Sequence, residues 1–206
     1  MLHKFMEICV VELPRSVTPL RSVRSTLIQS SITALRNHGH QERYLARLND
    51  LSPEHRERIV GSLAPEWLPV NVALAHYEAC DELGLSENEV AGLGEEVGER
   101  VQGTFMGTLL RGARSIGLTP WTPIGQLPRL WDRVFQGGGI GVTKRGPTDA
   151  LIELREMTLA RTAYFRSAVR GVFMAGIKVC GGRQVTVREF ESPSPGTRLQ
   201  LRAEWV

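Results

Sequence analysis

The sequence predicts an α+β fold in which an N-terminal helical layer packs on a C-terminal antiparallel sheet unit of order β-β-α-β-β. In residues 137–206, short runs of alternating or β-branched apolar residues flank one long amphipathic run with helical spacing. In residues 23–136, apolar residues instead recur at helical spacing between glycine and proline breaks. We therefore expect a strand and linker at 1–22, a helical part at 23–136 and a sheet part at 137–206, the last two forming one domain.

The N-terminal strand is expected within residues 5–13, because Ile8 to Val11 are β-formers and Pro14 ends the run. A loop should follow at 14–22. Ser52 before Pro53 predicts a helix start, with serine as the N-cap and proline in the first turn. The helices of the helical part are expected at residues 23–37, 41–49, 52–62, 71–83, 87–116 and 127–136.

The helix at 87–116 is unusual in its glycine content. Ser86 and Glu89 have the spacing of a capping box at its start. Each glycine inside a helix costs about 1 kcal/mol relative to alanine, so tertiary packing has to hold this helix together. Gly103 and Gly107 lie four residues apart and share one face. That face suits a close approach to another helix.

The C-terminal unit begins after the glycine run 137–139. Strands are expected at 140–145 and 148–155, joined by a turn at Gly146-Pro147. A helix is expected at 163–179, with strands at 185–190 and 199–205. The glycine run follows a helix and opens a strand, whereas a phosphate-binding loop follows a strand and opens a helix. We therefore interpret the run as a helix C-cap and turn.

Composition argues against several classes of protein. The net charge of +3 is spread along the chain, and no basic run is interleaved with aromatic residues, so nucleic-acid binding is not expected. Three widely spaced cysteines give neither a zinc signature nor a disulfide framework, as in a cytoplasmic protein. No apolar run reaches the ~18 residues that a membrane-spanning helix needs.

No set of residues indicates catalysis, and an enzyme is not the expected class. His76 and Cys80 lie four residues apart and share a helical face, but two ligands alone do not make a metal site. A histidine satisfied by its neighbours or exposed to solvent is the simpler interpretation of His76.

Several structural residues carry a resemblance over residues 23–206. They are Leu51 to Glu54, Pro65 to Pro69, Leu130 to Arg133, Gly137 to Gly141, Gly146-Pro147, Tyr164-Phe165, Gly171 and Glu204-Trp205. In these positions the chain resembles an uncharacterised bacterial family common in myxobacteria. That family is similar to the superfamily of haem-nitric-oxide-binding domains, 4-vinyl reductase domains and the small subunits of transport-protein-particle tethering complexes. The resemblance implies helices packed on an antiparallel sheet with a cavity between them, homodimers or heterodimers, and ligand sensing or scaffolding.

The chain departs from these relatives at their cofactor motifs. In 4-vinyl reductase domains, cysteines near the last hairpin can bind metal, but residues 191–198 contain no cysteine or histidine, so zinc is not expected. The haem-binding branch has a Tyr-x-Ser-x-Arg motif that Tyr164 to Ser167 does not match, so haem is not expected. In the tethering branch a cysteine can carry a fatty acyl chain in the cavity, and Cys80 lies on a predicted helix.

The aromatic residues suggest a pocket between the helices and the sheet, although ordinary core packing explains them as well. Our candidate lining residues are Trp67, Phe105, Trp131, Phe135, Phe165, Val169, Phe173 and Gly176. The sequence thus predicts a non-enzymatic sensory or regulatory domain that binds an apolar small molecule or a fatty acyl chain. The alternative is a dimeric interaction module without a ligand, with the face of Gly103 and Gly107 at its interface.

Overall fold

The computed structural model describes residues 7–105, 119–190 and 196–206, and it has the α+β architecture that the sequence predicts. Its main sheet has the strand order β1-β5-β6-β8-β7, with every neighbouring pair antiparallel. The strands are β1 (Ile8–Val11), β5 (Gly139–Gly146), β6 (Asp149–Arg155), β7 (Thr186–Glu189) and β8 (Leu199–Glu204). Helix α9 (Ala163–Val179) joins β6 to β7 through the short 3-10 helix η1 (Thr158–Arg161), so the β-β-α-β-β order is confirmed.

The main sheet has one buried and one solvated face. On β6, Ile152 pairs with Val142 of β5 and with Leu201 of β8, and all three side chains are buried. The alternate residues point outward, where Arg202 Nη2 lies 2.9 Å from Asp149 Oδ2. This alternation is the period-2 pattern of a sheet that covers a core on one side.

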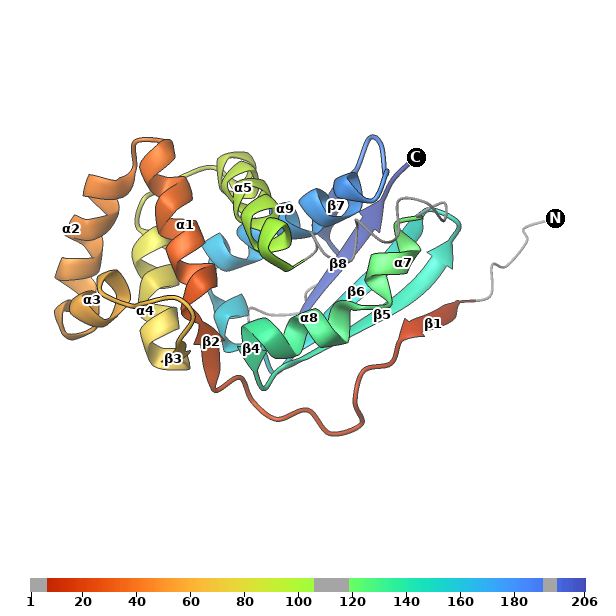
Figure 1. Ribbon diagram of the computed structural model, residues 1–206, viewed down its shortest axis with the longest axis horizontal. Coiled ribbons are helices and arrows are strands. Elements are labelled where there is room, and N and C mark those ends of the chain that lie inside the picture. The colour runs from red at the N-terminus through yellow and green to blue at the C-terminus, as the bar shows by residue number, and fades with distance from the viewer. Residues whose placement is uncertain (1–6, 106–118, 191–195) are drawn as a thin grey trace.

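The helical layer lies at one end of the molecule (Figure 1). It contains α1 (Ser25–Asn37), α2 (Gln41–Leu51), α3 (Pro53–Val60) and α4 (Val70–Asp81). Helix α5 (Glu87–Phe105) packs on α9, which extends from this layer to the sheet (Figure 1). Two further helices, α7 (Trp121–Ile124) and α8 (Leu127–Val134), precede β5. No helix in the described parts of the chain is long and apolar enough to cross a membrane.

A second, small sheet was not predicted from the sequence. It has the order β3-β2-β4, formed by β3 (Trp67–Pro69), β2 (Ser22–Arg24) and β4 (Phe135–Gln136). The sequence predicts a helix from residue 23, which would include Val23 and Arg24, and no strand between the helices at 52–62 and 71–83. Strands of two or three residues are too short to show a period, and they pair here only because tertiary packing brings three distant segments together.

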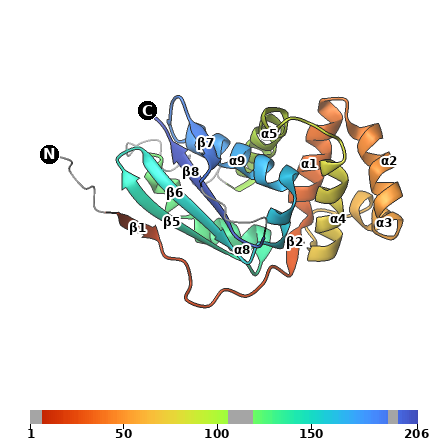
Figure 2. The ribbon, with the colours of Figure 1, turned by 180° about the vertical axis from the view of Figure 1, so that it is seen from behind.

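The N-terminal segment also belongs to the sheet. Strand β1 pairs with β5, and the chain between β1 and β2 then runs extended along the outside of the molecule (Figure 2). It is held there by backbone hydrogen bonds, including one of 2.8 Å from Gly138 N to the carbonyl oxygen of Thr18. Among the described residues, the segment 8–18 therefore lies along β5, with Leu13 and Val17 against its first residues.

Three local interpretations change. Ser52 precedes α3, but its side chain makes no capping hydrogen bond. Helix α8 ends at Val134, so Gly137 is not its C-cap; Gly137 and Gly138, with φ of 88° and 64°, form the turn from β4 to β5. Helix α7 lies between the helices predicted at 87–116 and 127–136, where no helix is expected. The capping box of α5 is confirmed, because Ser86 N donates to Glu89 Oε2 at 2.8 Å and Glu89 N donates to Ser86 Oγ at 3.3 Å.

Candidate functional site

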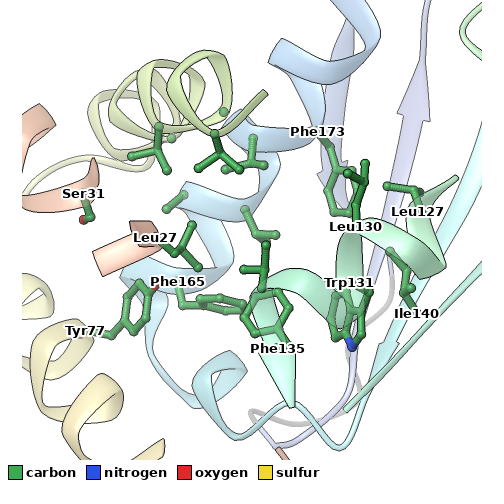
Figure 3. A pocket seen from close by; sticks show the side chains of 18 of the residues that line it. Leu27, Ser31, Tyr77, Leu127, Leu130, Trp131, Phe135, Ile140, Phe165 and Phe173 are labelled. Atoms are coloured by element: carbon green, nitrogen blue, oxygen red, sulfur yellow. The ribbon is translucent and has the colours of Figure 1, made fainter. Parts of the chain in front are cut away.

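An apolar cavity of about 170 Å³ lies between the helical layer and the sheet (Figure 3). Among the described residues, its wall comes from α1, α4, α5, α8, β4, β5 and α9. The lining residues are Leu27, Ser31, Tyr77, Gly94, Val97, Gly98, Val101, Leu127, Leu130, Trp131, Val134, Phe135, Ile140, Tyr164, Phe165, Ala168, Val169, Val172 and Phe173. Ser31 and Tyr77 lie at one end of the cavity, opposite Leu127 and Ile140 (Figure 3).

The cavity wall follows from the amphipathic pattern of its helices. On α8 the four lining residues recur at i, i+3, i+4 and i+7, and on α5 four lining residues have the same spacing. This spacing places them on a single face of each helix. The residues that the sequence marks as core-facing therefore enclose a space instead of filling it.

Small residues set the distance between the two central helices. An ideal Cβ atom on Gly94 of α5 would lie 2.0 Å from the carbonyl oxygen of Ala168 on α9. A Cβ atom on Gly171 of α9 would lie 1.9 Å from the carbonyl oxygen of Ala91 on α5. The two backbones are thus in direct contact, and Gly94 and Gly98 expose backbone to the cavity. The glycines of α5 therefore allow a close crossing of α5 and α9 within this chain.

The predicted shared face of Gly103 and Gly107 is not described. Gly103 lies in the last turns of α5 with its surroundings undescribed, and Gly107 lies outside the described residues. The dimer interface predicted there stays a prediction.

Aromatic contacts hold the wall in place. The rings of Trp131 and Phe135 are 4.5 Å apart between centroids, and Trp131 Nε1 donates to the carbonyl oxygen of Gly137 at 3.2 Å. Tyr77 and Phe165 pack edge to face with centroids 5.2 Å apart. These contacts fix the large side chains at the rim and middle of the cavity.

The structure brings together five of the eight residues that the sequence suggested as lining. Those five are Trp131, Phe135, Phe165, Val169 and Phe173. Trp67 lies in β3 instead, with the guanidinium of Arg24 4.1 Å from its ring centroid. Gly176 is not part of the lining, and the side chain of Phe105 lies outside the described part of the structure.

Sequence reasoning missed the lining from α1 and α4. Leu27, Ser31 and Tyr77 reach the cavity because their helices pack against α5 and α9. Tyr164 was noted only as part of a motif. A hydroxyl residue on the apolar stripe of α1 is the only local signal that could have singled out Ser31.

A line of buried polar side chains leads to the cavity. The hydroxyl of Tyr44 lies 2.7 Å from His76 Nδ1, and His76 Nε2 lies 3.1 Å from Ser31 Oγ. Ser31 Oγ lies 3.4 Å from the hydroxyl of Tyr164. Burial lowers the pKa of His76 to about 3 and raises the pKa of Tyr44 and Tyr164, so all four groups are neutral near pH 7.

Metal ligation finds no support at His76. Both of its ring nitrogens have hydrogen-bond partners, and Cys80 Sγ lies 3.8 Å from Nε2. In the part of the chain that the structure describes, no group of three His, Cys, Asp or Glu residues could hold a metal ion. His76 is a buried, hydrogen-bonded histidine.

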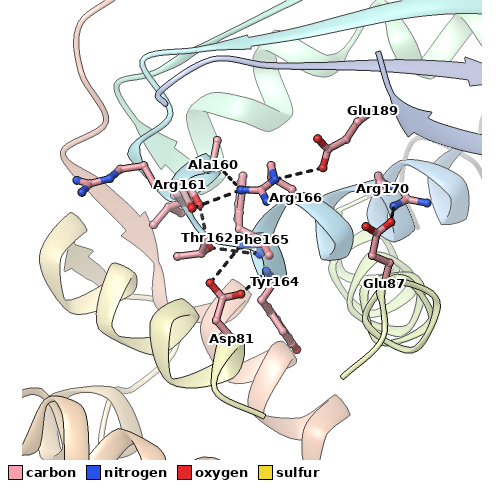
Figure 4. Close-up of polar contacts among 12 residues, drawn as sticks. Asp81, Glu87, Ala160, Arg161, Thr162, Tyr164, Phe165, Arg166, Arg170 and Glu189 are labelled. Atoms are coloured by element: carbon pink, nitrogen blue, oxygen red, sulfur yellow. Dashed lines mark hydrogen bonds and ion pairs between the residues drawn. The ribbon is translucent and has the colours of Figure 1, made fainter. Parts of the chain in front are cut away.

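Asp81 fixes the start of α9 (Figure 4). Its carboxylate accepts hydrogen bonds from Ala163 N at 3.1 Å and Tyr164 N at 2.5 Å. The hydroxyl of Thr162 accepts from Phe165 N at 3.4 Å. These bonds satisfy free N–H groups of the first turn and so orient Tyr164 and Phe165 toward the cavity.

No protein-family model matches the chain, and no curated protein matches it in sequence. Solved structures with a similar fold include H-NOX domains. A variant of the H-NOX protein from K. algicida, in the unliganded Fe(II) state, gives a TM-score of 0.63 at 8% identity over 89% of this chain and 96% of that chain. An oxygen-binding H-NOX domain related to soluble guanylate cyclases gives 0.55 at 12% identity over 88% and 94%. A structure concerned with haem redox potential and porphyrin distortion gives 0.57 at 13% identity over 88% and 99%.

These likenesses establish an H-NOX-like fold and agree with the superfamily resemblance inferred from the sequence. They also correct one expectation. We had not expected haem, but the structural neighbours are haem proteins, so haem is a candidate cofactor for this fold. A motif mismatch at Tyr164 to Ser167 was too weak a reason to dismiss it.

The described cavity can be tested against haem directly. Haem iron in proteins is held by His, Cys, Met or Tyr. Among the described lining residues only tyrosines, Tyr77 and Tyr164, belong to that set. The volume of about 170 Å³ also falls below the roughly 300–1,000 Å³ typical of pockets for drug-sized ligands. In this conformation the described cavity offers only tyrosine oxygens as iron ligands and is smaller than such pockets, so we derive no chemical step that involves haem.

Proposed function

We propose that this protein is a non-enzymatic sensory or regulatory domain that binds a small apolar molecule in the cavity between its helices and sheet. The observation that carries the proposal is the cavity itself, lined mainly by aliphatic and aromatic side chains from seven elements. An apolar cavity of about 150 Å³ in another protein stays dry and binds benzene or xenon. A cavity of about 170 Å³ is therefore large enough for a ligand of that size.

The arrangement also suits a sensor. The wall joins the helical layer to the sheet through α8 and α9, so a ligand contacts both layers at once. A ligand that changes how one layer packs on the other would therefore also change the surface that the protein presents to a partner. Membership of the myxobacterial family, a cytoplasmic location and a fatty acyl ligand stay predictions.

Benzene titration with calorimetry and thermal unfolding tests the proposal. We expect saturable binding and a rise in the unfolding temperature, because a ligand that binds only the folded state stabilises it. Val169→Phe places a ring in the cavity and should weaken benzene binding by about tenfold or more. Val179→Phe is the matched control, since Val179 lies on the same helix and is 44% exposed. Wild-type protein that fails to bind benzene, or Val169→Phe that binds it as well, would contradict the proposal.

A haem-based sensor is the second candidate, favoured by the haem proteins among the structural neighbours. Its test is reconstitution of the purified protein with hemin, followed by desalting and absorption spectroscopy. A Soret band that survives desalting in the wild type and disappears in Tyr164→Phe or Tyr77→Phe would assign haem to this site. A band that both variants retain would place haem elsewhere.

A further inference from the structure

We propose that the cavity ligand carries one hydrogen-bond acceptor, such as a nitrile, carbonyl or ether group, and that the hydroxyl of Tyr164 donates to it. The inference rests on the proposed function and specifies the class of ligand that the same cavity takes. It comes from the direction of the buried hydrogen-bond line Tyr44, His76, Ser31 and Tyr164.

The line is fully enclosed. Tyr44 and His76 are 0% exposed, Tyr164 is 4% exposed and Ser31 is 5% exposed. Its members come from α2, α4, α1 and α9, so four helices meet at it. Buried polar groups of this kind are hydrogen-bonded wherever geometry allows, because an unmet donor costs about 1–3 kcal/mol.

The direction of the line is set at its far end. The Tyr44 hydroxyl has one partner among the described residues, His76 Nδ1 at 2.7 Å. If Nδ1 carried the proton, the Tyr44 proton would have no acceptor. Tyr44 therefore donates to Nδ1. The single proton of the neutral imidazole then sits on Nε2.

The remaining bonds follow in order. His76 Nε2–H donates to Ser31 Oγ at 3.1 Å. The proton of Ser31 needs an acceptor of its own, and among the described residues the Tyr164 oxygen at 3.4 Å is the partner that remains, so Ser31 donates to Tyr164. Tyr164 accepts at this point, and its O–H proton is the one left over at the end of the line.

The leftover proton belongs to a residue of the cavity wall. Both Ser31 and Tyr164 line the cavity, and Tyr164 otherwise interacts with the thiol of Cys80. A thiol sulfur is a weak acceptor, so a ligand oxygen or nitrogen competes with it effectively. A ligand that offers only donors finds no such partner at Tyr164.

The same wall restricts the charge of the ligand. No lysine or arginine side chain is among the described lining residues, so an ionised carboxylate would enter without a counter-charge. Moving such a group out of water is strongly unfavourable. The chemical class is therefore a neutral, compact and mostly apolar molecule with one acceptor.

Benzonitrile and phenylacetylene provide the test, because they have nearly the same shape but only benzonitrile has a strong acceptor. We expect the wild type to bind benzonitrile about three- to tenfold more tightly in calorimetric titrations, the range of one net hydrogen bond. Tyr164→Phe should reduce this ratio to about one while both probes still bind. Tyr77→Phe, at the other tyrosine of the wall, should change the affinity for both probes alike and so keep their ratio. Val179→Phe, outside the cavity, is the control that should change neither affinity.

The nitrile stretching band of bound benzonitrile gives a readout that does not need a variant. A nitrile that accepts an O–H proton absorbs at higher frequency than one in a hydrocarbon environment, so we expect this shift in the wild type. Equal binding of the two probes, or an unshifted band, overturns the inference and leaves the apolar cavity standing. Loss of the preference in Tyr77→Phe instead overturns the assignment to Tyr164. Failure of both probes to bind overturns the proposed function as well.

Discussion

The α5–α9 crossing makes a sharp prediction, because Gly171→Ala should destabilise the protein even though alanine is the better helix former. The new Cβ atom would lie 1.9 Å from the Ala91 carbonyl oxygen and 2.6 Å from Glu95 N, both backbone atoms of α5. Ordinary contact begins at 3.4 Å, so the helices would have to separate by about 1.5 Å (3.4 minus 1.9) at this point. Overpacking costs up to about 3 kcal/mol, and alanine returns about 1 kcal/mol of helix propensity. We expect a net loss of about 2 kcal/mol in the free energy of unfolding.

Urea unfolding followed by circular dichroism measures this change, with linear extrapolation to zero denaturant. Gly92→Ala is the matched control, because Gly92 lies exposed on α5 and its added Cβ would meet nothing within 4 Å. There the same substitution should stabilise the protein by about 0.5–1 kcal/mol. The close-contact reasoning is refuted if Gly171→Ala is as stable as the wild type, or if both variants change stability in the same direction.

Three further predictions concern acid stability, a helix cap and the sheet. The pKa of His76 is lowered in the folded state, so the unfolded chain takes up the proton first on acidification; the stability from the neutral histidine is complete above about pH 6.5 and is lost toward about pH 3. In urea titrations, the contribution of this group to the free energy of unfolding should fall by about 2 kcal/mol from pH 7 to pH 5. His76→Gln should abolish this pH dependence, and an unchanged pH dependence in the variant would show that other groups cause it. Thr162→Ala should cost about 1 kcal/mol by removing the hydroxyl that caps α9, and Thr162→Ser should restore it, as measured by the urea midpoint. Ile152→Ala should cost about 2–5 kcal/mol at the buried centre of the sheet, whereas Glu153→Ala on the outer face should change stability by less than about 1 kcal/mol; similar losses would contradict the assigned faces.

The local sequence pattern was sufficient to predict most of the helices and strands. The alternation from Leu199 to Glu204 predicted β8, and the helical run at 163–179 matched α9. These segments are long enough to show their period, and their caps and turns act over a few residues. The small sheet of β2, β3 and β4 could not be found in this way, because its pairs join residues far apart in the sequence.

Part of the candidate site was accessible by the same reasoning. Trp131 and Phe165 lie on apolar helical stripes, and such stripes face a core or a cavity wherever the helices pack. Whether the stripes meet or leave a space depends on helix separation, which no single stripe encodes. The polar end of the cavity depends on how α1 and α4 pack, so Tyr77 gave no local signal, and Ser31 gave only that of a hydroxyl on the apolar stripe of α1.

The sequence by itself determined the α+β class, the faces of the helices and strands, and the tight-packing character of the glycine-rich helix, since each depends on neighbours within a few residues. Only the tertiary structure decided what those faces enclose. It showed that Gly94 and Gly171 bring the backbones of α5 and α9 into contact. It also showed that the buried hydrogen bonds from Tyr44 end at Tyr164, a residue of the cavity wall. Both depend on contacts between distant segments, whose geometry is fixed when the layers pack against one another.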